Sequence, residues 1–222
     1  MTTTSGWVLV LDTATSTIVV AAGTREGAVL ASDAFEGRYR HSQELLPAVN
    51  RLLERARLGL SDLAAVIVGT GPGAFTGLRV GLATAKTLAH ELRVPVIGIA
   101  TSAALLDAAG GAKRLWLPSG RRDRLLIVAG GAPVLTHDGP AVEEGEGDLA
   151  VDLPGRASEA ALERGRAAVA ALPESLLRLG LARLAAGDSD DPERLVPAYA
   201  VAPRGAPATD TEGGVAWSHD PR

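Results

Sequence analysis

Residues 64–92 form the segment AAVIVGTGPGAFTGLRVGLATAKTLAHEL, which combines the patterns of a strand, a glycine-rich turn and a long helix. Residues 64–69 are apolar and uncharged, which is typical of a strand covered on both faces. Glycines and a proline at 69–73 suit a tight turn with unusual backbone dihedrals. From Phe75 to Leu92 the apolar residues recur with helical spacing. The segment therefore predicts a buried strand, a turn and a helix.

The glycine turn has two interpretations. The first turn of a helix carries unpaired N–H groups and partial positive charge, so this turn could hold an anion. Alternatively, its glycines only allow two backbone segments to cross closely. Asp12 and Thr13 follow the first strand and could face a phosphate through magnesium or water, but we favour the interpretation that they only shape the turn. The candidate phosphate-facing residues are Asp12, Thr13, Gly71, Gly73 and Thr76.

Composition narrows the class of protein. Hydrophobic residues make up 46% of the 222 residues but aromatic residues only 3%, so Ala, Val and Leu must build the core. A net charge of −4 argues against broad nucleic-acid binding by this chain alone. The chain has no cysteine, so it forms no disulfide. We see no signal peptide at the N-terminus and no apolar run of the roughly 20 residues that a helix needs to span a bilayer. We expect a cytoplasmic protein that does not bind membranes.

The first hundred residues predict a layered α/β unit. We expect strands at 7–11, 17–22, 28–32, 64–69 and 96–99, and helices at 42–57 and 75–93. Ser42 is a candidate N-cap for the first helix, although Pro47 favours a start nearer Leu46. Thr101 or Ser102 is the candidate cap of a further helix that ends near Gly110.

The second half carries weaker patterns. We expect a hairpin of strands at 115–117 and 125–129 whose basic tip at 121–124 is solvated. An acidic loop at 138–152 is expected to be exposed and not to form a metal site. Helices are expected at 157–171 and 174–186, a last strand at 195–201 and a poorly ordered tail from 203.

The two long helices have distinct faces. The helix at 42–57 carries an apolar stripe, and the helix at 75–93 has a ridge of small residues every fourth position, Gly77, Gly81, Ala85 and Ala89. Such a ridge permits close packing against either the chain's own sheet or a partner, and both interpretations stay open.

No catalytic constellation can be assembled from the motifs. The Gly69-x-Gly71-x-x-Ala74 spacing matches a dinucleotide fingerprint formally, but the next strand lacks the acid that a Rossmann unit requires. Walker A, HExxH and GxSxG patterns are absent. His41 has no recognisable catalytic partner. We therefore predict no catalytic residue, metal site or cofactor.

Several motifs resemble the TsaB (YeaZ) family. They are LDTATSTIVVA at 11–21, RHSQELLPAV at 40–49, GPGAFTGLRVGLATAKTLA at 71–89, VPVIGIATS at 94–102 and, more weakly, PAYAVAPR at 197–204, where Ala200 and Val201 depart from the family's pattern. The resemblance implies an α/β, two-lobed fold of the actin/Hsp70/sugar-kinase (ASKHA) type with a reduced second lobe. We expect an N-terminal lobe at 1–100, a smaller lobe at 101–202 and a disordered tail at 203–222.

The resemblance also implies a function. TsaB proteins are noncatalytic subunits that bind and stabilise TsaD, with TsaE, in the complex that transfers threonylcarbamoyl to N6 of the adenosine beside the anticodon of tRNAs reading ANN codons. They can form homodimers by the same surface when alone, which leaves monomer or homodimer open for the isolated chain, and the resemblance implies that tRNA is bound only through the complex. TsaD-like sequences place two metal-binding histidines where this chain has Thr101 and Leu105. The expected second lobe also lacks the Asp-x-Gly-Gly phosphate loop that ATPases of this fold use.

By the same resemblance, the partner-binding surface lies on the helices at 42–57 and 75–93. The residues predicted to form it are His41, Leu45, Leu46, Val49, Leu52, Leu53, Leu78, Gly81, Leu82, Ala85 and Ala89. The alternative is a stand-alone ASKHA-type ATPase or small-molecule kinase that uses Asp12 and the 69–76 turn.

Overall fold

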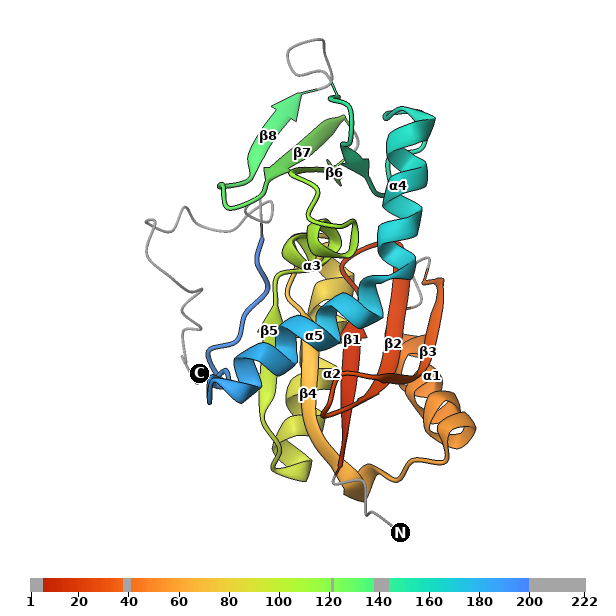
Figure 1. Ribbon diagram of the computed structural model, residues 1–222, viewed down its shortest axis with the longest axis vertical. Coiled ribbons are helices and arrows are strands. Elements are labelled where there is room, and N and C mark those ends of the chain that lie inside the picture. The colour runs from red at the N-terminus through yellow and green to blue at the C-terminus, as the bar shows by residue number, and fades with distance from the viewer. Residues whose placement is uncertain (1–5, 38–40, 121, 138–143, 200–222) are drawn as a thin grey trace, which may run out of the picture.

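The computed structural model describes residues 6–37, 41–120, 122–137 and 144–199, which form two sheets flanked by helices (Figure 1). The first sheet has the order β3-β2-β1-β4-β5. Its strands are β1 (Trp7–Asp12), β2 (Thr17–Thr24), β3 (Val29–Glu36), β4 (Leu63–Gly69) and β5 (Val96–Ile99). The pairs β1–β2 and β2–β3 are antiparallel, whereas β1–β4 and β4–β5 are parallel.

Helices cover both faces of this sheet. The helices α1 (His41–Ala56) and α2 (Phe75–Leu92) lie behind it in Figure 1, and α5 (Leu172–Ala185) crosses in front. Side chains alternate along β1, so Leu9 and Leu11 pack with α1 and α2 while Val8 and Val10 pack toward α5. This double coverage explains why β1 and β4 are almost uninterrupted apolar runs.

The second sheet has the order β8-β7-β6-β9 and lies at the top of Figure 1. Its strands are β6 (Arg114–Ser119), β7 (Asp123–Val128), β8 (Val134–His137) and β9 (Leu149–Ala150), with the helices α3 (Thr101–Ala108) and α4 (Glu159–Ala170) beside them. The predicted hairpin is present as β6–β7, and the two-sheet α/β class is confirmed.

Some local predictions were wrong. α1 begins at His41 and contains Pro47, which lies on its exposed side, where an unbonded carbonyl can meet water. The N-cap residue of α3 is Ala100, whose side chain makes no capping hydrogen bond. Thr101 does not act as the cap, and its hydroxyl donates to the carboxylate of Asp12. No strand forms at 195–199. Instead, Ala198 N donates to Thr70 O at 2.8 Å.

The C-terminal elements return to the first sheet. We expected residues after 100 to belong to the second lobe, but α5 packs on β1, β2, β4 and β5. Beyond it, Asp190 forms a bridge with Val96 at the edge of β5. The predicted tail at 203–222 lies outside the described residues. In the part of the chain that is described, no helix has the length and apolarity to cross a membrane.

Candidate functional site at the glycine turn

Asp12 is the last residue of β1, at the edge of the first sheet where the parallel strands β1 and β4 end, and it is fully buried. Its Oδ2 accepts a hydrogen bond from Thr101 Oγ1 at 2.6 Å, and its Oδ1 accepts from Ala14 N at 2.9 Å. A Cβ atom on Gly69 would lie 1.7 Å from Asp12 Oδ2, so only glycine allows this approach. Burial raises the pKa of Asp12 to about 6, although the bonds from Thr101 and Ala14 act to lower it.

The glycine turn is joined to the same network. Gly71 N donates to Thr101 Oγ1 at 3.1 Å, and Gly71 has a φ of +98°, which favours glycine. Ala74 N donates to Ala14 O at 2.7 Å. A Cβ on Gly73 would meet that oxygen at 2.1 Å. The glycines thus serve a close crossing of two turns, in agreement with the second interpretation of the sequence.

Thr13 joins the β1–β2 turn to α2. It is fully buried, and its Oγ1 donates to Gly77 O at 2.7 Å. A Cβ on Gly81 would lie 2.2 Å from Thr13 Oγ1. The small-residue ridge of α2, which includes Ala85 and Ala89, is buried against the chain's own sheet. This placement decides between the two interpretations of the ridge.

The candidate phosphate-facing residues do not converge on one open site. Asp12 and Thr13 are buried and bonded within the fold, and Gly71 is buried as well. Gly73 and Thr76 are exposed. The structure therefore agrees with the interpretation that Asp12 and Thr13 shape the turn, because neither side chain reaches the surface.

A cleft of about 600 Å³ lies between the glycine turn and the second lobe. Its lining residues are Ala14, Thr15, Pro72, Gly73, Ala74, Phe75, Leu117, Pro118, Ser119, Gly120, Leu125, Asp152 and Tyr199. Among these described residues Asp152 is the single charged one. At the rim, the guanidinium of Arg79 lies 3.9 Å from the centre of the Phe75 ring and donates to the hydroxyl of Tyr199 at 3.1 Å.

Among the residues that the structure describes, His, Asp and Glu side chains form no cluster of three or more. Thr101 and Leu105, the positions aligned above with metal-binding histidines, are both buried in α3. Thr101 is occupied by the Asp12 network, and Leu105 belongs to the core on the α5 side of the sheet.

The residues predicted to bind a partner divide into two groups. Leu46 is 50% exposed on α1. The side chain of His41 lies outside the described residues. The other nine are buried within the chain's own lobe: Leu45, Val49, Leu52, Leu53, Leu78, Gly81, Leu82, Ala85 and Ala89. The prediction that these nine residues form a binding surface is therefore corrected: they belong to the core, because the inner faces of both helices cover the sheet.

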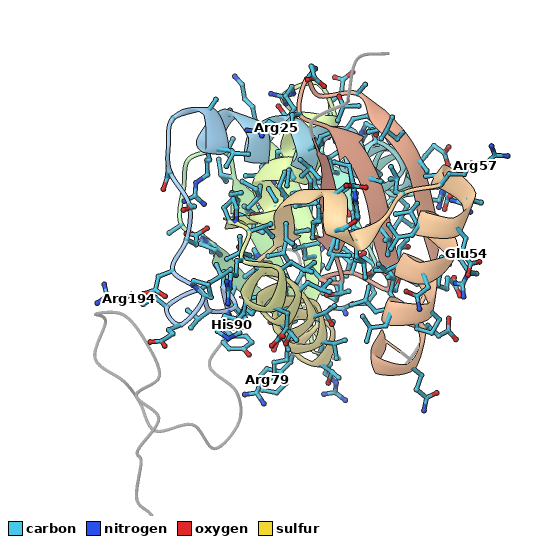
Figure 2. All side chains as sticks on the ribbon, turned by 90° about the horizontal axis from the view of Figure 1, so that it is seen from below. Arg25, Glu54, Arg57, Arg79, His90 and Arg194 are labelled. Carbon is cyan, nitrogen blue, oxygen red and sulfur yellow. The ribbon has the colours of Figure 1, made fainter. Side chains whose placement is uncertain are left out.

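Apart from Leu46, the exposed residues of α1 and α2 differ from those predicted to bind a partner. The exposed set includes Gln43, Leu46, Pro47 and Asn50 on α1, and Thr76, Arg79, Ala83, Thr87 and His90 on α2. In Figure 2, Glu54 projects outward from α1, Arg57 projects outward just after the end of α1, and Arg79 projects outward from α2. The surface that a partner can reach is therefore mixed, with small, polar and charged side chains around Leu46.

Sequence reasoning missed the buried polar cluster of the second lobe. Asp148 is 3% exposed and accepts from Trp116 Nε1 at 2.7 Å. Arg124 stacks 4.7 Å from the Trp116 ring centre, and its side chain is only 12% exposed. The predictions of an exposed acidic loop and a solvated basic tip were therefore wrong at these two residues. The one available signal was that a buried tryptophan needs an acceptor.

Comparison with known proteins connects this fold to a family. A family model described as TsaD, tRNA N6-adenosine threonylcarbamoyltransferase, matches residues 36–160. An uncharacterised protein of Mycobacterium tuberculosis is 41% identical over 105 residues, 47% of this chain and 48% of that protein. The tRNA threonylcarbamoyladenosine biosynthesis protein TsaB of Escherichia coli is 38% identical over 107 residues, 48% of this chain and 44% of TsaB.

A solved structure supports the same relationship. YeaZ from Pseudomonas aeruginosa superposes with a TM-score of 0.66 at 26% identity, covering 87% of this chain and 99% of YeaZ. By sequence, the matched region spans about half the length of the curated relatives. The similarity in sequence thus concerns about half of each protein, whereas the similarity in fold extends over most of this chain.

Proposed function

Since the chain belongs to the family described as TsaD, tRNA N6-adenosine threonylcarbamoyltransferase, and is similar within it to the TsaB (YeaZ) proteins, we propose that it is a noncatalytic subunit of tRNA threonylcarbamoyladenosine biosynthesis. It acts in the cytoplasm by binding and stabilising a catalytic TsaD subunit, and TsaE joins the pair. The tRNA is contacted through the assembled complex, and the isolated chain forms a homodimer.

The Asp12 network is the observation that carries the noncatalytic assignment. A carboxylate at the end of β1 is well placed to hold a hydrated metal ion if it is exposed. In this chain Oδ1 of Asp12 accepts a hydrogen bond from Ala14 N and Oδ2 accepts one from Thr101 Oγ1, and the residue has no exposed surface. The residue that the ATPase alternative requires is therefore part of the structural core.

The outer face of α1 and α2 is the proposed TsaD-binding surface. Leu46 supplies exposed apolar area on α1, and Ala83 and Thr87 are small enough for the backbone of α2 to be approached closely. Arg79 on α2 and Arg57, which directly follows the end of α1, are exposed and suit the polar rim of an interface. An interface of about 1,600 Å² would be sufficient for a stable complex.

Co-purification tests the proposal. The chain is expressed with the TsaD protein of the same organism, and the two are passed together over a gel-filtration column. We expect them to elute as one complex. Separate elution at micromolar concentrations would contradict the assignment.

Calorimetric titration tests the alternative function. We expect the isolated chain to show no ATP hydrolysis and no tight binding of ATP with magnesium. Turnover in the absence of TsaD would favour the stand-alone ATPase instead.

A further inference from the structure

The β1–β2 turn uses the carboxylate of a residue in the other lobe to satisfy its donors. Ser16 N donates to Asp152 Oδ2 at 2.6 Å, and Ser16 Oγ donates to Asp152 Oδ1. Asp152 lies just after β9, 136 residues further along the chain. A backbone N–H and a hydroxyl that converge on two carboxylate oxygens form the kind of donor pair that also binds a free anion.

Four other donors of this turn are occupied within the first lobe. Ala14 N donates to Asp12, and Thr17 N donates to Thr15 Oγ1 at 3.2 Å. The hydroxyls of Thr13 and Thr15 donate to backbone carbonyls of the first lobe. Ser16 is therefore the residue of this turn whose donors point across to the second lobe, and Asp152 accepts both of them.

The backbone at Asp152 shows that this contact is held by the surrounding structure. Its φ is +57°, in the left-handed region that glycine occupies without cost. Aspartate tolerates this region better than most residues, but it is still a conformation that tertiary contacts must maintain. The bonds to Ser16 are such contacts, and they aim the carboxylate at the turn.

Asp152 also places a negative charge in the cleft between the lobes. Among the described residues that line this cleft, Asp152 is the single charged one, and the guanidinium of Arg79 lies at the rim, against Phe75 and Tyr199. Ser16 itself lines a second hollow, which Asp152 shares with Arg166. A phosphate group entering between Thr15 and Ser16 would meet the Asp152 carboxylate and find the donors of Ser16 taken. Repulsion between like charges and the loss of two bonds both oppose its binding.

We propose that Asp152 is a specificity-determining residue, a built-in anion that occupies the donor site of Ser16 and excludes phosphate-bearing ligands from the cleft. It also joins the two lobes through the same two bonds. This inference concerns the isolated chain and does not depend on whether the chain binds TsaD.

Asp152→Gly is the informative variant, because glycine suits the φ of +57° and leaves the donors of Ser16 free. The probe is inorganic pyrophosphate, titrated calorimetrically into the full chain. Glu146→Gln is the control, since it removes the same charge from an exposed residue outside the cleft. We expect Asp152→Gly to bind pyrophosphate at least ~10-fold more tightly than the wild type, and the control to match the wild type.

Two results would overturn the proposal: wild-type binding as tight as that of Asp152→Gly, or no gain in Asp152→Gly when circular dichroism shows it folded. Adding Ser16→Ala to Asp152→Gly is expected to reverse most of the gain, because it removes one of the two donors. If Asp152→Gly does not fold, Asp152→Asn is measured in its place. It keeps the side-chain volume, and binding no tighter than that of Glu146→Gln would equally reject the proposal.

Discussion

The hydroxyl of Thr101 donates to the carboxylate of Asp12 at 2.6 Å, which joins the start of α3 to the end of β1 across 89 residues of sequence. The same hydroxyl accepts from Gly71 N, so one side chain connects a strand, a helix and the glycine turn. Because the Asp12 side chain is fully buried, its oxygens depend on these protein donors in place of water.

Replacing Thr101 by valine is expected to destabilise the chain by about 1–3 kcal/mol, since it leaves Asp12 Oδ2 and Gly71 N buried without this partner. Urea unfolding followed by circular dichroism measures the loss. Thr101→Ser is the control, because it retains the hydroxyl. Equal stability of Thr101→Val and the wild type would show that the network contributes nothing.

The pKa of Asp12 predicts how stability changes with pH. Burial raises this pKa from 3.8 to about 6 in the folded state, so between these values the folded chain binds more protons than the unfolded chain. The contribution of Asp12 is therefore fully present below pH 4 and is lost as the pH rises through 6, by about 1–3 kcal/mol.

The Asp12→Asn variant isolates this contribution. The difference in free energy of unfolding between wild type and variant should shift against the wild type from pH 4 to pH 7. A difference that stays constant over this range would contradict a raised pKa for Asp12.

Gly69→Ala is expected to cost about 1–3 kcal/mol or more, because its Cβ would lie 1.7 Å from Asp12 Oδ2 and force the buried carboxylate to move. Gly131→Ala is the matched control, since its nearest neighbour would be at 3.4 Å, in ordinary contact. Thermal melts of the two variants measure the effect. Similar melting temperatures would mean that the crossing at Gly69 tolerates a side chain.

Partner binding is predicted to depend on the outer face of α1 and α2. Leu46→Asp and Ala83→Arg place charge or bulk on exposed positions, and each is expected to weaken co-elution with TsaD at least ~10-fold while the melting temperature changes little. Ala160→Arg, on the exposed side of α4, is the control for added bulk. Normal co-elution of both variants would place the interface elsewhere.

Ala85→Arg separates the two faces of α2. Because Ala85 is fully buried against the sheet, arginine there is expected to unfold the chain rather than to block a partner selectively. Circular dichroism of the purified variant measures this. A folded Ala85→Arg chain that fails to bind TsaD would mean that the small-residue ridge of α2, and not the outer face of α1 and α2, contacts the partner.

Residues 64–92 determined much of the fold through local patterns. An uncharged β-branched run, glycines at the turn and helical spacing from Phe75 are properties of neighbouring residues, and the structure has β4, the turn and α2 where they predict. The β6–β7 hairpin and β5 were found in the same way. Periodicity also identified the apolar stripe of α1, but it could not tell whether a sheet or a partner covers that stripe.

Tertiary structure alone decided what the polar residues do. Asp12 meets Thr101, Asp148 meets Trp116 and Ser16 meets Asp152 only after distant segments have packed, so no spacing in the sequence predicts these bonds. The short strand β9 is likewise defined by its pairing with β6. Local patterns fix where backbone elements form because those patterns repeat with the period of the element. The burial of a carboxylate depends on which segments fold over it, and that is a property of the assembled chain.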